Sequence, residues 1–101
     1  MTIKKTTDKY DFYQEDNYYV LDLGNIKKGE DTTTVLLFED TNNLKVTTTC
    51  GCTATDKKEL GDNKVEYKVS YNKCESTFSK TLNCENNNTN FLIKIKGKCQ
   101  Q

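Results

Sequence analysis

The chain has 101 residues, of which 34% are hydrophobic and 30% charged, with 15 basic and 15 acidic side chains. This apolar content is enough for one small core, and the balanced charge argues against a nucleic-acid-binding protein that works by neutralising phosphates. Histidine is absent, so no side chain titrates near neutrality with an unperturbed pKa. We therefore expect a single folded domain with no enzymatic activity and no cofactor.

Residues 1–17 are expected to form an N-terminal arm. The start, Met1 to Asp8, carries lysines but no apolar stretch of signal-peptide length, and no run in the chain approaches the roughly 20 apolar residues of a membrane span. Farther along the arm stand Tyr10, Phe12 and Tyr13. Aromatic side chains are enriched at interface hot spots. We expect the arm to reach a neighbouring subunit; the alternative is an extra strand on the domain's own sheet.

Period-two alternation of apolar and polar residues dominates the rest of the chain, residues 18–99, and no window carries a helical stripe. Seven strands are expected, at 18–23, 32–39, 44–49, 52–56, 64–72, 76–84 and 90–97. Turn residues such as Gly24-Asn25 and Asn42-Asn43 stand between them. Seven short antiparallel strands at these intervals are typical of an all-β, immunoglobulin-like β-sandwich.

The alternation also predicts which side chains face the core, because a slip by one residue would turn the apolar set outward. Lys80 falls in phase with this set, so we expect a bulge there or a lysine that reaches out to solvent. The predicted inward set is Tyr19, Leu21, Leu23, Leu36, Phe38, Leu44, Val46, Val65, Tyr67, Val69, Tyr71, Phe78, Leu82, Phe91, Ile93 and Ile95.

The same register leaves Tyr18, Val20, Val35 and Leu37 pointing outward, on a sheet that we expect the first, second and fifth strands to share. Clustered exposed apolar side chains are a candidate contact surface. Together with Tyr10, Phe12 and Tyr13 of the arm, they form the predicted partner-binding set. The alternative is that the N-terminal segment folds back and covers them.

Five cysteines offer the one sharp chemical hypothesis. If seven strands alternate up and down, Cys50 and Cys52 reach the same end of the sandwich as Cys74 and Cys99, while Cys84 lies at the opposite end. Four thiolates at one end would suit zinc, although the C-x-C spacing is shorter than in most structural zinc sites. Without an export signal we expect reduced thiols that act as small buried side chains. A disulfide and a metal site are the alternatives.

The order of motifs resembles a bacterial family of immunoglobulin-like domains, the Hydin-type (ASH) sandwiches with a C-G-C-T motif. The matching residues are Leu21 to Gly24, Lys27 to Glu30, Phe38 with Asn42 and Asn43, and Cys50 to Thr53. The likeness continues through 78–81 and 93–97. This resemblance implies the fold but no chemistry.

In size, fold and composition the chain also resembles the small auxiliary capsid proteins of crAss-like phages. That resemblance implies a structural virion protein that decorates the capsid of a tailed bacteriophage, in many copies, by binding the major capsid protein after assembly in the host cytoplasm. No nucleic-acid or membrane partner is expected. The alternatives are a bacterial ASH-like module for cell-envelope binding or assembly, in the periplasm or at the cell surface, and a thiol or metal-binding domain that uses Cys50 and Cys52.

Overall fold

The computed structural model describes residues 1–48 and 51–100, and within these residues the regular structure consists of nine β-strands. No helix in this part of the chain is long and apolar enough to cross a membrane. The strands are β1 (Thr2–Lys5), β2 (Asp11–Glu15), β3 (Tyr18–Lys27), β4 (Thr34–Glu39), β5 (Lys45–Thr48), β6 (Thr53–Gly61), β7 (Lys64–Tyr71), β8 (Phe78–Asn86) and β9 (Thr89–Gln100).

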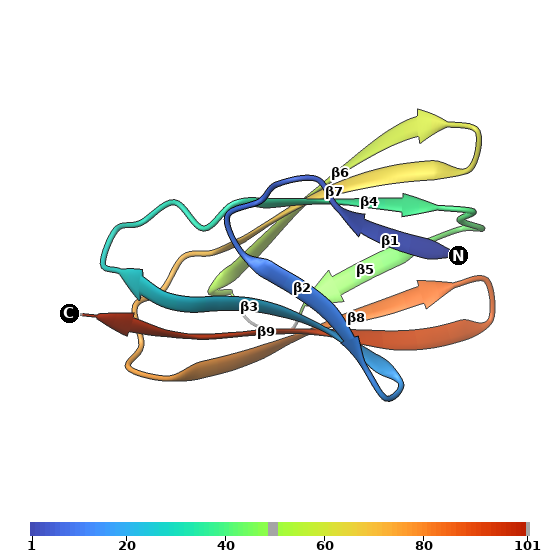
Figure 1. The fold of residues 1–101 in the computed structure, drawn as a ribbon. Coiled ribbons are helices and arrows are strands. Elements are labelled where there is room, and N and C mark those ends of the chain that lie inside the picture. The colour runs from blue at the N-terminus through green and yellow to red at the C-terminus, as the bar shows by residue number, and fades with distance from the viewer. Residues whose placement is uncertain (49–50, 101) are drawn as a thin grey trace.

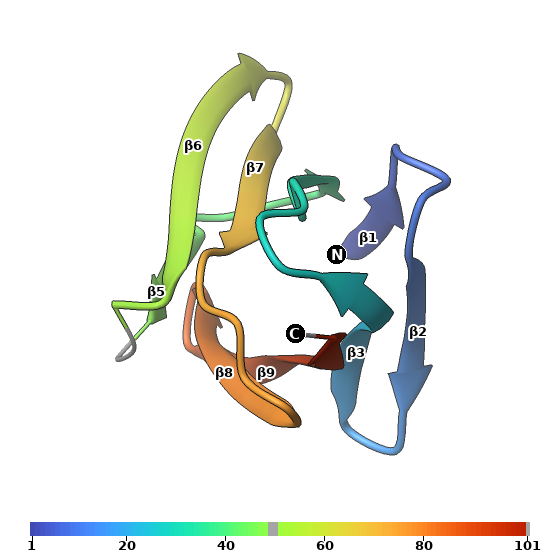
Figure 2. The ribbon, with the colours of Figure 1, turned by 90° about the vertical axis from the view of Figure 1, so that its left-hand side faces the viewer.

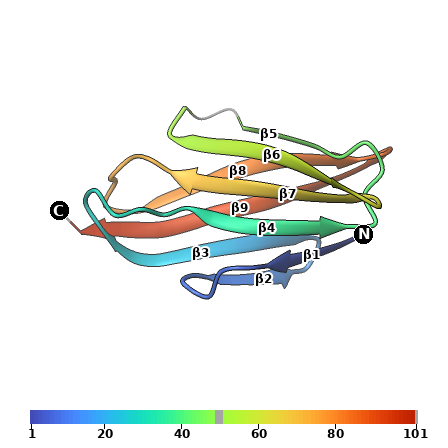
Figure 3. The same cartoon turned by 90° about the horizontal axis from the view of Figure 1, so that it is seen from above.

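The strands form two facing sheets, one in the order β1-β4-β7-β6 and the other in the order β2-β3-β9-β8-β5 (Figure 1). Seen from above, the two layers run along the same long axis of the molecule (Figure 3). All strand pairs are antiparallel except β3 and β9, which are parallel. The predicted all-β sandwich is therefore confirmed as a two-sheet architecture.

Each of the seven predicted strands is present, with corrected ends. The largest difference is β6, which runs to Gly61 although the prediction ends it at residue 56. Residues 56–61 are exposed on both faces, and β6 is the outermost strand of its sheet. An edge strand needs little apolar material to stay paired, so its polar half gives no alternation that a sequence pattern can detect.

The position of β3 corrects the predicted sheet composition. Sequence alternation places the first predicted strand in the same sheet as 32–39 and 64–72, but β3 pairs with β9 and lies in the opposite sheet from β4 and β7. The β3–β9 register shifts between Asp22 and Asn25, where Gly24 has a φ of +62° and donates its N–H to Asp22 Oδ1 at 2.9 Å. Strand partners depend on how the loops cross, which alternation does not encode.

The N-terminal segment 1–17 is not a free arm. Its strand β1 pairs with β4, and its strand β2 pairs with β3, so the segment crosses from one sheet to the other (Figure 2). The alternative of extra strands on the domain's own sheets is the correct one. Alternation is short in both strands, with four residues in β1 and five in β2. Each completes an existing edge, which is a tertiary effect.

The predicted core register is confirmed. Every residue of the predicted inward set belongs to the core cluster or packs against it; Leu36 and Ile93 are completely inaccessible to solvent. Five buried apolar or sulfur-bearing residues were not in that set: Tyr10, Val20, Ile26, Cys84 and Cys99. Lys80 pairs regularly with Ile95, so there is no bulge. Its ammonium instead reaches out to Glu75 Oε1 at 3.7 Å.

Gly97 on β9 is tightly packed and leaves no room for a side chain. A Cβ at this position would stand 2.8 Å from Cζ of Phe78 and 3.0 Å from the Gly24 carbonyl oxygen. The Phe78 ring is itself held by stacking on Tyr71, with ring centroids 3.9 Å apart. A side chain at residue 97 would have to displace a buried ring.

We predict that Gly97→Ala lowers the free energy of unfolding by about 1–3 kcal/mol, the usual cost of overpacking. Gly51→Ala is the matched control, since a Cβ there would meet nothing within 4 Å. Chemical denaturation of the two variants checks this. Equal stability of both variants would mean that Phe78 does not pack over β9 as described.

Candidate functional site

The structure divides the predicted partner-binding residues among three places. Tyr10 and Phe12 turn inward and join or contact the core. Tyr13, Tyr18 and Val20 lie on the outer face of the five-stranded sheet, whereas Val35 and Leu37 lie on the outer face of the other sheet. The seven residues therefore do not form one surface.

Tyr10 anchors the N-terminal segment to the turn that follows β3. Its side chain is 6% exposed, and its hydroxyl donates a hydrogen bond to Glu30 Oε2 at 2.6 Å. Lys9 supports the same contact, with its ammonium 3.6 Å from Glu30 and 2.9 Å from the carbonyl oxygen of Asp31. The pKa of Glu30 is lowered, mainly by the hydrogen bond from Tyr10. The pKa of Tyr10 is raised, mainly by burial of its side chain. Tyr10 thus acts within the domain.

Phe12 packs in a row of three aromatic rings within the five-stranded sheet. Its ring stacks on Tyr19 with centroids 5.6 Å apart and nearly parallel planes, and Tyr19 meets Phe91 edge to face at 5.8 Å. The three rings come from β2, β3 and β9, which are neighbours in one sheet. Aromatic pairs of this kind add to the stabilisation from area burial. Phe12 is therefore occupied by intramolecular packing.

Tyr13, Tyr18, Val20, Lys94 and Lys96 form a continuous patch on the outer face, which we call the tyrosine–lysine surface. Val20 on β3 stands opposite Tyr13 on β2 and Lys94 on β9. The Lys94 ammonium lies 4.3 Å from the centre of the Tyr18 ring, in a cation–π contact. With these neighbours, Val20 is only 2% exposed, although it points away from the core. The predicted exposure of Val20 is therefore wrong.

Hydrogen bonds order the two tyrosines of this surface. Tyr18 donates its hydroxyl to Glu15 Oε2 at 2.8 Å, which is the main cause that raises the pKa of Tyr18. A hydrogen bond with Tyr13 is the main cause that raises the pKa of Lys96. The rings stay partly exposed while their polar ends are held. Rigid, amphipathic tyrosines of this kind suit protein recognition, because little side-chain entropy is lost on binding.

Val35 and Leu37 on β4 lie instead in a ladder of charged side chains. Leu37 stands between Lys4 on β1 and Glu66 on β7, and Val35 stands opposite Lys68. Both are partly buried. This face offers isolated apolar residues among charges, which is normal for a protein surface and needs no functional explanation.

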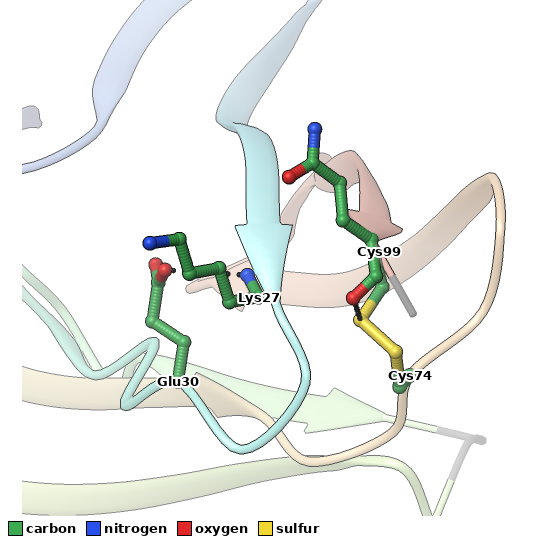
Figure 4. Close-up of a disulfide and its surroundings, with 5 residues drawn as sticks. Lys27, Glu30, Cys74 and Cys99 are labelled. Carbon is green, nitrogen blue, oxygen red and sulfur yellow. Dashed lines mark hydrogen bonds between the residues drawn. A yellow bond between two sulfur atoms is a disulfide. The ribbon is translucent and has the colours of Figure 1, made fainter.

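At one end of the sandwich, Cys74 and Cys99 form a disulfide with a Cα–Cα distance of 5.3 Å (Figure 4). The bond ties the β7–β8 connection to β9, and the Cys99 N–H also donates to the Glu75 carbonyl oxygen at 2.9 Å. The predicted meeting of Cys74 and Cys99 at one end is confirmed. The predicted reduced state of this pair, which followed from the lack of an export signal, is wrong.

The cysteine set proposed for zinc is brought together only in part. Cys52 lies at the disulfide end, where its carbonyl oxygen accepts the N–H of Asn72 at 2.6 Å, and Cys50 lies outside the described residues. The sulfurs of Cys74 and Cys99 are bonded to each other and are not thiolates. Within residues 1–48 and 51–100, no three His, Cys, Asp or Glu side chains gather closely enough to hold a metal ion.

Cys84 lies on β8 and remains a free thiol. It is 2% exposed, and burial raises its pKa to about 12. A thiol that stays protonated and inaccessible is unreactive, since the thiolate is the nucleophile. Cys84 therefore serves as a small core side chain.

A hollow of about 410 Å³ lies beside the disulfide, lined in part by Lys27, Lys28, Glu30 and Lys73. Figure 4 shows the Lys27–Glu30 turn next to Cys74 and Cys99, with the Lys27 N–H donating to Glu30 at 3.3 Å. Glu30 is already bonded to Tyr10 and Lys9. Its carboxylate thus holds the turn and the N-terminal segment together.

The comparison with known proteins returned nothing: no protein-family model, curated protein or solved structure matches this chain. The tyrosine–lysine surface is therefore the site that geometry alone supports best. The two tyrosines of this surface belong to the predicted partner-binding set, whereas Lys94 and Lys96 do not. Their contacts with Tyr18 and Tyr13 depend on the β3–β9 and β2–β3 pairings.

We predict that Tyr10→Phe destabilises the protein at neutral pH and that this difference shrinks in acid. The pKa of Glu30 is lowered in the folded chain, so stability from its ionised form is present above its unfolded pKa and is lost as the pH falls through the folded value. Removing the Tyr10 hydroxyl removes the main cause of this lowered pKa of Glu30. Denaturation from pH 7 to pH 2 measures the difference. In a Glu30→Gln background, Tyr10→Phe should show no such pH dependence; the same dependence there would contradict the assignment.

We also predict that the double variant Cys74→Ser, Cys99→Ser has a free energy of unfolding about 3–4 kcal/mol lower than that of the parent chain. The bond joins residues separated by 25 positions, and closing a loop of that length lowers the entropy of the unfolded chain. Denaturation without reductant measures this. Reductant should lower the stability of the parent more than that of the variant. Peptide mapping after alkylation that recovers Cys74 and Cys99 as free thiols from the native chain would contradict the bond.

Proposed function

We propose that this chain is an immunoglobulin-like domain of the ASH type that acts by protein–protein contact and has no enzymatic activity. The strand order supports the fold assignment: β4-β7-β6 and β9-β8-β5 match the B-E-D and G-F-C groups of immunoglobulin sandwiches. The first strand of that scheme corresponds to β3, which here pairs with the last strand. The resemblance through Leu21 to Gly24 and Lys27 to Glu30 falls on β3 and the turn after it.

We further propose that the domain is an auxiliary protein that decorates the capsid of a tailed bacteriophage and binds its major capsid protein. The observation that carries the proposal is the tyrosine–lysine surface, where ordered, partly exposed tyrosines lie on a rigid sheet. Tyrosine is one of the residues that dominate binding energy at interfaces. On a capsid, many copies would each contribute such a contact, and a lattice of repeated sites compensates for modest affinity at each one.

The disulfide is compatible with this location. Disulfides persist on virion and cell surfaces, whereas the cytoplasm keeps thiols reduced. The chain would be made and assembled in the host cytoplasm, and Cys74 and Cys99 would be oxidised once the particle leaves the cell. The hydrogen bond from the Cys99 N–H to the Glu75 carbonyl oxygen also holds the segment after Cys74 beside β9.

The same disulfide favours a second candidate, a bacterial ASH-like module that serves cell-envelope binding or assembly in the periplasm or at the cell surface. Those compartments are oxidising as well. In that case the tyrosine–lysine surface would contact an envelope protein. The two candidates differ in whether the chain is found in purified particles or in the envelope fraction.

We predict that Tyr18→Ala weakens binding to undecorated capsids of the encoding phage by roughly 2 kcal/mol, or about thirtyfold, as expected for a hot-spot aromatic. Tyr13→Ala should act in the same direction. Co-sedimentation or surface binding measures the affinity, and thermal denaturation confirms that each variant is folded.

Val35→Ala is the matched control, since Val35 is partly buried on the outer face of the opposite sheet. It should bind as the parent does. Unchanged binding by both tyrosine variants, together with a loss in the Val35 variant, would place the interface on the other sheet. Recovery of the native chain only in envelope fractions would favour the second candidate.

A further inference from the structure

Within residues 1–48 and 51–100 the sandwich has four edge strands, β1 and β6 in one sheet and β2 and β5 in the other. An edge strand presents unpaired backbone N–H and C=O groups to which another chain can pair, and native proteins protect such edges with charge, short length or irregularity. The four edges differ in this protection. That difference indicates which edge is suited to a partner.

Three edges are protected. The β6 edge carries the consecutive charges Asp56 to Glu59 and then a register shift before Gly61. The β1 edge has four residues, two of them lysines. The β5 edge spans Lys45–Thr48 among the described residues and lies beside β6, where the two sheets come together (Figure 2).

The β2 edge is different because its centre, Phe12-Tyr13-Gln14, is uncharged and contains no glycine. Its pairing with β3 is regular from Asp11 to Glu15. Phe12 fastens the strand from the core side by stacking on Tyr19. Within the described residues, β3 is the only strand that pairs with β2. This edge is thus regularly paired on one side and, among the described residues, has no strand partner on the other.

The charges on this edge exclude one occupant and favour another. Asp11, Tyr13 and Glu15 share the outer face with the β3 residues opposite them, and Asp11 stands directly across from Asp22. Like charges directly opposite are destabilising, and opposite charges stabilise the pair. A second copy paired antiparallel about Tyr13 would place Asp11 against Glu15 of the other chain. A strand with basic residues at those positions would instead neutralise both carboxylates.

We propose that the free edge of β2 binds an extended segment of a partner protein as an additional antiparallel strand. Basic side chains four residues apart on the segment face Asp11 and Glu15, and the apolar side chain between them packs on Tyr13. Backbone hydrogen bonds provide affinity, and the alternating side chains provide specificity. This inference rests on the proposed protein-binding function and gives the chemistry of the partner, since Tyr13 belongs both to this edge and to the tyrosine–lysine surface.

The test is a titration of the full chain with the synthetic peptide Thr-Lys-Thr-Val-Thr-Lys-Thr, whose two ends are chemically blocked. NMR spectra of the protein monitor the binding. The peptide should shift the amide resonances of Asp11 to Glu15 and leave those of the β6 edge unchanged. Two control peptides separate backbone from charge: a version with methylated backbone nitrogens on the pairing side, and a version with glutamate in place of lysine. Both should bind at least about tenfold more weakly.

A charge-reversal variant completes the test. Asp11→Lys with Glu15→Lys should prefer the glutamate peptide over the lysine peptide, and Asp11→Lys also removes the repulsion with Asp22, so the fold should be retained. Asp56→Lys with Glu59→Lys on the β6 edge is the matched control and should keep the lysine preference.

Three results would overturn the inference: no binding of the lysine peptide at millimolar concentration, equal binding of the methylated peptide, or concentration-dependent shifts of β2 without peptide, which would identify a second copy as the occupant. These outcomes are separable from the proposed function. Peptide failure with tyrosine-dependent capsid binding removes only the edge proposal. Peptide binding by a chain that has no affinity for capsids would refute only the proposal that the partner is a capsid.

Discussion

The parallel pairing of β3 with β9 is the constraint on which the rest of this structure depends. It makes β9 the central strand of the five-stranded sheet, with β3 and β2 on one side and β8 and β5 on the other. The disulfide ends on β9 at Cys99, Gly97 of β9 leaves no room for a Cβ beside Phe78, and both lysines of the tyrosine–lysine surface project from it. Fold, covalent bond and candidate site therefore share one strand.

The N-terminal segment then completes what this pairing leaves open. With β3 beside β9, the outer side of β3 and the outer side of β4 are both available, and β2 and β1 occupy them. In these positions Tyr10 is hydrogen-bonded to Glu30, and Phe12 stacks on Tyr19. Burying aromatic rings against the domain itself removes the apolar surface that a free arm would expose to water. The rings of Tyr13 and Tyr18, by contrast, stay partly exposed on the outer face.

The two sheets differ in the chemistry of their outer faces. The other sheet carries a cross-strand pattern of charges, with Lys4 and Lys64 paired to Glu39 at 2.8 and 3.8 Å. Exposed ion pairs of this kind contribute little to stability but keep a face hydrophilic. The β2 side has the tyrosines and the open edge. A partner that pairs with β2 would extend the five-stranded sheet and bring its own side chains next to Tyr13.

The sequence by itself determined the two-layer β architecture and the core. Alternation specifies which side chains face inward, because a slip of one residue in a strand reverses every side chain, and the residues from Leu21 to Ile95 follow that rule. Strand parity likewise brought Cys74 and Cys99 to one end. Both conclusions depend only on period and direction along the chain.

Tertiary structure alone decided strand partners and, with them, the candidate site. Whether β3 lies beside β4 or beside β9 depends on how the connection from Lys28 to Thr33 crosses between the sheets, and the alternation of β3 is the same in either place. Tyr18 and Lys94 are far apart in sequence and meet only through that choice. The short strands β1 and β2 form because an edge was already there to pair with. Non-local pairing is a property of the assembled sheets, and no local pattern encodes it.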